Sequence, residues 1–334
     1  MGAGNGAGLN GGVRLPDGWT ARRPTLDDVP VLLELARASD VAALGYPDFS
    51  LDDVHDALAA PNVDPAQDSW LAVDPDGVVA GWAYLENPTG ADREFVEIYV
   101  LPERGLPAQA PLLARQLERI AERAAGFGYD QVTVRAGAIP TERPWITTLE
   151  AAGFRFVKRY ARMRRPLAGV PTEPPPPPPG VRIRPLDHSD PADLRVFHRI
   201  LDTAFRDTPD YLPATFEQWC TQWRSLSTLS PDEWFVALVD GEPAGILQSS
   251  DQALESDEGW VKNLAVLREY RRRGVGAALL ARAFATYAGK GRKYAGLGVD
   301  LSNPTEAARL YRSMGMAPEY EADMFERTVA AARR

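Results

Sequence analysis

The chain contains little cysteine and little histidine. Among its 334 residues there is one cysteine, Cys220, and there are three histidines. A single thiol excludes an internal disulfide and makes a thiolate cage for a metal implausible. The histidines are scattered along the chain, so their spacing suggests no zinc site either. We therefore expect a protein that works without a metal.

Long apolar runs are also missing. No stretch approaches the ~18 consecutive apolar residues that a membrane-spanning helix needs. The opening segment, MGAGNGAGLNGG, has neither the basic start nor the apolar centre of a signal peptide. We interpret residues 1–12 as a flexible leader. These features predict a cytoplasmic protein without a membrane partner.

The chain has no excess of basic residues. Its 37 lysines and arginines face 46 acidic residues, which gives a formal net charge of −9. This balance argues against nucleic acid as a partner. It is consistent with a cationic, amine-bearing substrate, although an acidic surface is just as often a matter of solubility. The length and the 45% apolar content indicate a globular protein of two domains.

Two common phosphate-binding loops are absent or out of context. The sequence holds no G-x-x-x-x-G-K-[ST], which argues against a P-loop nucleotide enzyme. A G-x-G-x-x-G pattern occurs at Gly6, Gly8 and Gly11, but it lies in the leader and no strand precedes it. At Gly274 the same pattern fails, because Leu279 stands where the third glycine is needed.

The proline-rich segment 169–180 separates two similar halves. Its PTEPPPPPPG run favours a stiff polyproline II spacer. We predict an N-terminal domain over residues 13–168 and a C-terminal domain over residues 181–334. In each half an Arg-Pro segment precedes a helical pattern, and an Asp-Gly pair then joins two strand-like runs.

The halves continue in step after these hairpins. Gly81 and Gly245 fall at equivalent places, and the strand Glu97–Leu101 matches Asn263–Leu267. The repeated order is β-α-β-β-β-α-β-α-β, which predicts an α+β class with a mixed, mostly antiparallel central sheet flanked by helices. The alternative is that two unrelated α+β domains share hairpin turns by chance.

The segment Val261–Leu280 has the features of an anion site. A strand-like run leads through a basic turn into a helical pattern that begins at Ala277. Glycines in such a turn let a phosphate approach the outward backbone N–H groups and the positive end of the helix dipole. The residues that carry this prediction are Arg271, Arg272, Arg273, Gly274, Val275, Gly276 and Ala277. The alternative is that the arginines form a solvated charge run.

The spacing R-x-x-G-x-G resembles the pyrophosphate loop of the GCN5-related N-acetyltransferase (GNAT) superfamily, whose members bind acetyl-CoA. The resemblance implies a tandem GNAT fold over most of the chain. It also implies that the pantetheine arm pairs with the strand Leu264-Ala265-Val266, and that the N–H of Leu264 or Ala265 polarises the thioester carbonyl.

A second stretch, VDLSNPTEAARLYRSMGM at Val299–Met316, is similar to the motif that follows in this family. The similarity implies that Asn303 begins a helix and contacts the cofactor arm, and that Tyr311 protonates the departing thiolate. A phenol is protonated at neutral pH, which suits that role. The alternative for Tyr311 is a helix tyrosine packed on the sheet. Candidates for the general base are Asp257, Glu258 and Asp300, and none is assigned.

The N-terminal half lacks most of this pattern. Aligned helix starts put Pro107, Ala108 and Gln109 opposite Gly274, Val275 and Gly276, while Glu150 falls opposite Tyr311. We expect this half to be catalytically silent. Glu97, which aligns with Asn263, leaves a second acetyl-CoA site as the alternative.

These features predict an acetyl-CoA-dependent N-acetyltransferase that acts directly on a primary amine of a small molecule, as a monomer or homodimer. Cys220 lies outside both motifs, so transfer through a cysteine is not expected. The tandem layout is similar to that of mycothiol synthase and of tandem acetyltransferases encoded with antibiotic pathways. Two alternatives remain: a module that binds or senses acyl-CoA without turnover, and a protein-lysine acetyltransferase.

Overall fold

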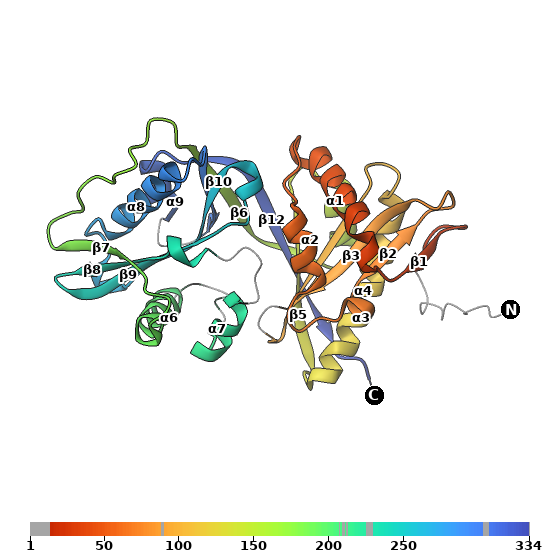
Figure 1. Cartoon of the computed structure of the whole chain (residues 1–334). Helices are drawn as coiled ribbons and strands as arrows, with labels where there is room; N and C mark the ends of the chain where they lie inside the picture. The colour runs from red at the N-terminus through yellow and green to blue at the C-terminus, as the bar shows by residue number, and fades with distance from the viewer. Residues whose placement is uncertain are drawn as a thin grey trace. The chain divides into compact units, whose positions relative to one another are not determined.

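The structure is a computed structural model that describes residues 14–333 except 88–89, 207, 209–210, 212, 225–229 and 303–306. The chain forms two compact units (Figure 1). Unit 1 comprises Met1–Val157 together with Asp323–Arg334, and unit 2 comprises Lys158–Ala322. Unit 1 is therefore not contiguous in sequence. The boundaries differ from the expected ones at 168 and 181, because each half ends in a strand that belongs partly to the other unit.

Unit 1 has the expected order of elements with additional short helices. Its elements are β1 (Thr20–Arg22), α1 (Val29–Leu44), α2 (Leu51–Leu58), α3 (Pro65–Asp68), β2 (Trp70–Val73), β3 (Val79–Glu86), β4 (Arg93–Val100), α4 (Leu106–Phe127), β5 (Gln131–Ala138), α5 (Arg143–Ala151) and the start of β6 (Arg155–Pro166). Its sheet has the order β1-β2-β3-β4-β5, and the last partner of β5 is β12 (Ala317–Ala330), through Asp323–Ala330.

Unit 2 repeats this order. Its elements are β7 (Val181–Pro185), α6 (Pro191–Phe205), α7 (Phe216–Arg224), β8 (Phe235–Val239), β9 (Glu242–Ser250), β10 (Glu258–Val266), α8 (Val275–Gly289), β11 (Tyr294–Asp300), α9 (Ala307–Ser313) and the start of β12. Its sheet runs β7-β8-β9-β10-β11, and β11 then pairs antiparallel with Tyr160–Pro166 of β6.

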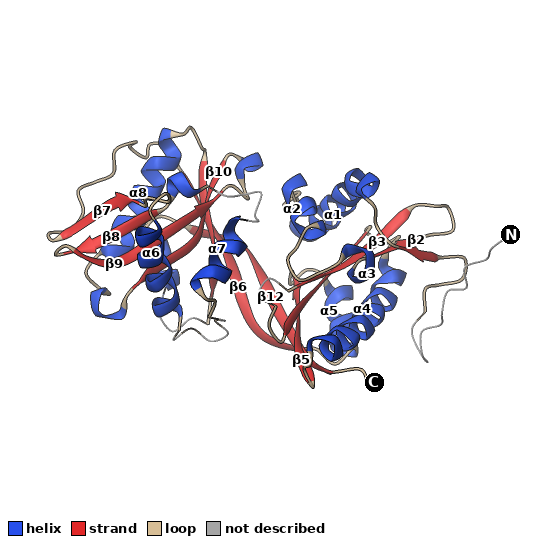
Figure 2. Cartoon of the chain, turned by 60° about the horizontal axis from the view of Figure 1, so that its bottom comes forward, coloured by secondary structure: helices blue, strands red, loops and turns tan. Residues whose placement is uncertain are grey.

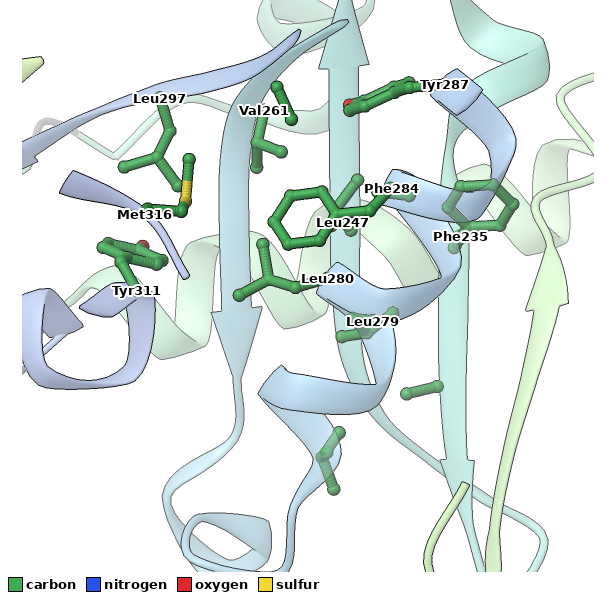
Figure 3. Packing of buried hydrophobic residues seen from close by; sticks show 14 of the residues in the cluster. Phe235, Leu247, Val261, Leu279, Leu280, Phe284, Tyr287, Leu297, Tyr311 and Met316 are labelled. Atoms are coloured by element: carbon green, nitrogen blue, oxygen red, sulfur yellow. The ribbon is translucent and has the colours of Figure 1, made fainter. Parts of the chain in front are cut away.

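Each sheet is antiparallel except at one place. The parallel pair is β4–β5 in unit 1 and β10–β11 in unit 2. Helices cover both faces of each sheet (Figure 2). In unit 2 the core under α8 and α9 contains Leu280, Phe284 and Leu297 (Figure 3), whereas the opposite face packs on α6 and α7. The predicted α+β class is confirmed.

The parallel pairs are short, which leaves part of one strand unpaired on that side. β10 follows β11 only from Glu258 to Val261, whereas its antiparallel pairing with β9 continues to Val266. β4 similarly pairs with β5 only at Arg93–Phe95. The two strands of each parallel pair therefore separate, and the later residues of β10 and β4 present a free backbone edge.

Candidate active site

The turn between β10 and α8 is shaped by two residues with left-handed backbone. Gly274 is the N-cap of α8 with φ 77°, and Arg272 has φ 63°. Glycine adopts such a φ without steric cost, whereas a side chain there is strained. The turn therefore depends on Gly274, and Arg272 adopts a backbone conformation that residues with a side chain rarely take.

The amides of this turn are available to a ligand. Within the described residues, the N–H groups of Arg272 to Ala277 donate no backbone hydrogen bond, and no side chain caps α8. The next amide, that of Ala278, already donates to the Gly274 carbonyl at 3.0 Å. Free N–H groups at a helix N-terminus carry partial positive charge and bind anions. This geometry matches the site that the sequence predicted.

The three arginines have different surroundings. Arg271 points back into the unit, where its Nε donates to the Val266 carbonyl at 3.1 Å. Arg273 forms an ion pair of 3.0 Å with Asp240 in the hairpin between β8 and β9. Arg272 is exposed, and among the described residues its side chain has no hydrogen bond or ion pair. Arg272 is therefore the arginine best placed to meet an anion.

Close packing surrounds both glycines of the turn. A Cβ on Gly276 would lie 3.0 Å from Leu310 Cδ2, and a Cβ on Gly274 would lie 2.8 Å from Pro178 Cγ. Pro178 belongs to the proline-rich segment, whose Thr172 lies 3.9 Å from the position of a Cβ on Gly289 at the other end of α8. The segment thus runs along α8 instead of acting as a free spacer.

The free edge of β10 follows a bulge. The pairing of β10 with β9 shifts by one residue between Val261 and Asn263, so Lys262 is the extra residue. A bulge bends a strand and re-aims the residues beside it. Because β10 separates from β11 at the same point, the bulge and the free edge coincide.

Hydrogen-bond alternation decides which amides of β10 face the free edge. The Leu267 N–H donates to the Ala244 carbonyl at 2.9 Å, on the β9 side. Successive residues of a strand point their backbone groups to opposite sides, so Ala265 also faces β9, whereas Leu264 and Val266 face the free edge. The Arg271 contact to the Val266 carbonyl agrees with this direction. Of the two amides proposed to polarise a carbonyl, only that of Leu264 is free.

Tyr311 lies in α9 beside Met316 and close to Leu297 (Figure 3). It is 8% exposed, and burial raises the pKa of its phenol to about 12. Its hydroxyl donates to none of the residues that the structure describes. The phenol is thus kept protonated and is not committed to a structural hydrogen bond. Asn303, the other residue of this motif, lies outside the described residues.

The three candidate bases lie in ion pairs. Asp257 pairs with Lys293, and Glu258 lies 3.1 Å from both Arg162 and Arg164. Asp300 lies 3.4 Å from Lys158. The parallel register of β10 with β11 ends at Val261↔Leu297, and Asp300 is the last residue of β11, three residues beyond Leu297. Glu258 lies at the start of β10, six residues before Leu264.

A neutral amide pair, which the sequence did not single out, stands beside this edge. Asn263 Nδ2 donates to Gln248 Oε1 at 2.6 Å, between directly paired residues of β10 and β9. This position of β10 is thus occupied by an amide that is already hydrogen-bonded, whereas the aligned position of β4 carries Glu97. This pair could have been predicted from the sequence only if the register of the β9–β10 pairing were known, because that register decides which polar residues face each other.

The corresponding turn of unit 1 shares one left-handed residue with the turn of unit 2, but its N-cap glycine is right-handed, with φ −87° where Gly274 has φ 77°. Gly105 is the N-cap of α4, and Glu103 has φ 59°. Arg104 pairs with Asp74 and Asp76 of the equivalent hairpin. Glu103, Arg104 and Gly105 therefore correspond to Arg272, Arg273 and Gly274, and the predicted alignment of Pro107 with Gly274 was wrong. The segment from strand to helix is three residues shorter in unit 1, not one.

Several amides of the unit 1 turn are already used. The N–H of Gly105 donates to Leu101 at 2.8 Å, and that of Ala108 donates to Gly105 at 2.9 Å. The residue between Leu106 and Ala108 is a proline, which has no N–H. A Cβ on Gly105 would lie 2.1 Å from the Ala80 carbonyl oxygen, so this glycine serves packing.

The tyrosine position of unit 1 also needs correction. At the ends of the short helices, the Phe154 N–H donates to the Leu149 carbonyl and the Met316 N–H donates to the Tyr311 carbonyl. Leu149, not Glu150, is therefore the equivalent of Tyr311. Leu149 is fully buried in the core, and its side chain has no proton to transfer.

Two further properties of the described residues bear on the site. They include no helix of the length and apolarity required to cross a membrane. They also include no group of three or more His, Cys, Asp or Glu side chains that could hold a metal ion.

Comparison with known proteins agrees with this geometry. The model of the acetyltransferase (GNAT) family matches residues 194–316, which contain the glycine turn and Tyr311. The structure is similar to a GCN5-related N-acetyltransferase from Sphaerobacter thermophilus, with a TM-score of 0.81 and 27% identity over 96% of this chain and 98% of that one. No curated protein matches the chain in sequence.

Two more distant structures share the fold. A tandem GNAT protein from the clavulanic acid biosynthesis pathway has a TM-score of 0.67 at 19% identity, over 94% of this chain and all of that one. A glucosamine N-acetyltransferase region of a fungal β-N-acetylglucosaminidase has a TM-score of 0.68 at 14% identity, over 93% of this chain and 38% of that one. Residues 194–316 therefore match the acetyltransferase (GNAT) family model, and the chain as a whole has the fold of a tandem GNAT protein.

Proposed function

We propose that unit 2 transfers an acetyl group from acetyl-CoA directly to a primary amine of a small molecule. The observation that carries this proposal is the row of free amides from Arg272 to Ala277 beside the free edge of β10. A diphosphate fits the first feature, and an extended arm with amides fits the second. Bound acetyl-CoA would supply an activated acetyl group.

Residues of unit 2 would then perform three tasks. The Leu264 N–H would donate to the carbonyl oxygen on which negative charge develops, as an oxyanion-hole donor does. The Tyr311 hydroxyl would give its proton to the departing thiolate. Asp300, at the end of β11, would accept a proton from the amine, directly or through water. No residue of this set is a nucleophile, which supports direct transfer.

The net charge of −9 is consistent with a cationic acceptor. Direct transfer also fits Cys220, which is buried against Trp219 and Trp223 in α7 and lies outside these elements. A small-molecule acceptor in the cytoplasm is part of the proposal, as is the silence of unit 1. Three features of unit 1 support the absence of catalysis there. Glu103 puts a negative charge at the turn, amides of that turn already donate hydrogen bonds, and Leu149 replaces the tyrosine.

The test is a matched pair of substitutions at the second residue of each helix. Gly276→Glu in α8 puts a carboxylate where the diphosphate would lie, and Pro107→Glu is its counterpart in α4. We expect Gly276→Glu to weaken acetyl-CoA binding at least about 100-fold by calorimetry, and Pro107→Glu to leave it unchanged. Unfolding curves establish that both variants fold.

Three results would contradict parts of the proposal. Unchanged binding in Gly276→Glu would overturn the cofactor site. Loss of binding in Pro107→Glu would show that unit 1 binds acetyl-CoA. Tight binding with no release of CoA in the presence of small amines, measured with a thiol reagent, would favour a sensing module, and acetylated lysines in added proteins would favour a protein acetyltransferase.

A further inference from the structure

The proline-rich segment 171–180 is anchored to unit 2 on both sides of its proline run. Leu167 before it and Val181 after it are buried in the core under α8. Between these anchors, Thr172 lies against the last turn of α8 and Pro178 lies against its first turn. The segment is therefore held along the whole length of the helix that follows the proposed diphosphate site.

The ring of Pro178 occupies the space in which a side chain at position 274 would begin. A Cβ on Gly274 would lie 2.8 Å from Pro178 Cγ, and its next two neighbours would be Cβ and Cδ of the same ring, at 3.8 Å and 3.9 Å. Pro178 is half-buried, whereas Pro175–Pro177 are exposed. Pro178 is thus the proline of this run that covers the turn.

This contact bears on the conformation of the turn. Gly274 has a φ of 77°, which glycine adopts without strain but also leaves easily, because it has more accessible conformations than any other residue. The free amides from Arg272 to Ala277 form their row around this residue. A proline ring is rigid, and a polyproline II segment has little internal freedom. Contact with Pro178 therefore restricts the alternatives open to Gly274.

Backbone hydrogen bonds hold Pro178 itself in place. Its carbonyl accepts from the Val181 N–H at 3.0 Å, and the Gly180 carbonyl accepts from the Asp240 N–H at 2.8 Å. Asp240 also forms the ion pair of 3.0 Å with Arg273, the residue before Gly274. Both partners of that ion pair are exposed, so it stabilises the turn little by itself. The packing of Pro178 is the stronger of the two links between the segment and the turn.

Unit 1 has the same entry into its first strand but lacks the contact. The Trp19 N–H donates to the Pro16 carbonyl at 3.1 Å, as the Val181 N–H does to Pro178 in unit 2. The nearest atom to a Cβ on Gly105, however, would be the Ala80 carbonyl oxygen, and the next two belong to Val100 and Leu101. The turn before the first strand is therefore part of the repeated fold. A proline on the helix-start glycine is specific to the half with the free amides.

We propose that Pro178 is a positioning residue of the acetyl-CoA site. Through its contact with Gly274, the proline-rich segment holds the helix-start turn in the conformation that binds the diphosphate. This inference rests on the proposed function of unit 2. A turn that is ordered before binding loses less conformational freedom when the ligand arrives, so its affinity is higher. The segment that joins the two halves in sequence thus contributes to coenzyme affinity.

Two proline-to-alanine substitutions in the same run test this role. Pro178→Ala removes Cγ and Cδ from the side of Gly274, whereas Pro176→Ala makes the same chemical change at an exposed position. We expect Pro178→Ala to weaken acetyl-CoA binding about five- to tenfold by calorimetry, and Pro176→Ala to change it less than about twofold. Unfolding curves separate this from a general loss of stability, which would lower the melting temperature without changing the affinity of the folded protein.

A double-mutant cycle tests whether the contact itself is the cause. Gly274→Ala places a methyl group 2.8 Å from Pro178 Cγ, in addition to straining φ. Pro178→Ala removes that close contact. We therefore expect the double variant to bind acetyl-CoA at least about threefold more tightly than the product of the two single losses predicts. Losses that simply multiply would show that positions 178 and 274 act independently, and would overturn the proposal.

Limited digestion with trypsin gives a readout that needs no coenzyme. Trypsin cleaves after arginine, and Arg271, Arg272 and Arg273 lie in the turn. Exposed segments are cut faster when they are less ordered. We expect Pro178→Ala to speed cleavage at these arginines at least about fivefold, with the products identified by mass spectrometry. Pro176→Ala should leave the rate unchanged.

The two measurements distinguish the possible failures. Unchanged affinity or unchanged cleavage in Pro178→Ala would overturn the positioning role, and so would equal effects of Pro176→Ala. Failure of the proposed function is recognised separately. The parent protein would then bind no acetyl-CoA, or Gly276→Glu would bind it normally, whatever the rates of cleavage.

Discussion

Comparison of the two helix-start turns separates what the fold needs from what a ligand needs. Both turns contain a left-handed residue, an arginine and a glycine in that order, and in both the arginine pairs with an aspartate of the preceding hairpin. That ion pair is therefore part of the fold. What differs is the charge of the left-handed residue, Glu103 or Arg272, and whether the amides are free. These differences belong to ligand binding.

The central strands of the two units, β10 and β4, also differ. β10 has a bulge at Lys262 and a neutral Asn263–Gln248 pair, whereas β4 pairs with β3 without a shift and carries Glu97 opposite Tyr84. Unit 2 thus keeps the features that would hold a coenzyme, and unit 1 carries a carboxylate on the equivalent strand. The two copies of one fold therefore differ both in their free backbone amides and in the charge of the paired side chains on these strands.

The largest effect should come from separating the halves at the proline-rich segment. A fragment of residues 167–334 lacks β6, including Ala161 and Met163, which are fully buried in the unit 2 core. Loss of one large core side chain lowers the free energy of unfolding by about 2–5 kcal/mol, whereas the whole free energy of unfolding of a domain is about 5–15 kcal/mol. We expect this fragment to be unfolded by circular dichroism. The fragment 155–334, which retains β6, should keep more structure, and equal behaviour of the two would contradict the assignment of β6 to unit 2.

The next effect concerns the proton donor. Tyr311→Phe should lower kcat by about 100- to 10,000-fold with little change in acetyl-CoA affinity, because the phenol acts only when the thiolate leaves. Tyr287→Phe in the same core is the control, since that hydroxyl is held by Ser249. It should lower the melting temperature and leave kcat within a few-fold. A Tyr311→Phe enzyme with normal kcat would rule out the assigned role.

The carboxylate of Glu97 should make unit 1 sensitive to pH, because burial and the nearby Glu86 and Glu142 raise its pKa. The pKa of Glu97 rises from 4.5 in the unfolded chain to about 8 in the folded one, so between these values the folded state holds a proton that the unfolded state releases. Stability therefore falls as pH rises, by up to about 1.4 kcal/mol per pH unit, and the loss ends above the folded pKa.

Melting curves between pH 4 and pH 9 check this expectation. Glu97→Gln should match the parent protein near pH 4, and its advantage in melting temperature should grow as the pH rises towards 8 and stay constant above that. The same change in the parent and in Glu97→Gln would show that other groups cause the pH dependence.

The smallest effect should distinguish the two left-handed residues. Arg272→Glu reverses an exposed charge beside the proposed diphosphate site, and we expect the KM for acetyl-CoA to rise about tenfold, less at high salt. Glu103→Arg makes the opposite change in unit 1 and should leave that KM unchanged. If Glu103→Arg instead created a second acetyl-CoA site, the hydrogen-bonded amides of unit 1 would not be the reason why that unit does not bind acetyl-CoA.

Local patterns in the sequence predicted much of this structure. The element order, the hairpins and the α8 turn follow from glycine spacing and apolar periodicity, which act over a few residues. The alignment of the two repeats at this turn was predicted wrongly. The strand-to-helix segment of unit 1 is three residues shorter than that of unit 2, so Gly105, not Pro107, is the equivalent of Gly274. Loop length alters such an alignment without leaving a local signal.

Features that depend on contacts across the sheet also could not be predicted from the sequence. The choice of Leu264 over Ala265 depends on the register with β9, and the Gln248–Asn263 pair depends on the bulge at Lys262. The raised pKa of Glu97 becomes apparent only when its burial and its neighbours are known. The assignment of the last strands to opposite units required pairing between residues at least 128 positions apart, as for Tyr294 and Pro166.

The position of β12 has an evolutionary consequence. The final residues of the chain, Asp323–Arg334, complete the sheet of unit 1, although they are encoded after everything that unit 2 needs for its turn and its tyrosine. A premature stop codon there would damage the half without a coenzyme turn, and deletion of the first half of the gene would remove a strand from the other. Loss of either half would therefore disturb the sheet of the other, so the two copies depend on one another for folding.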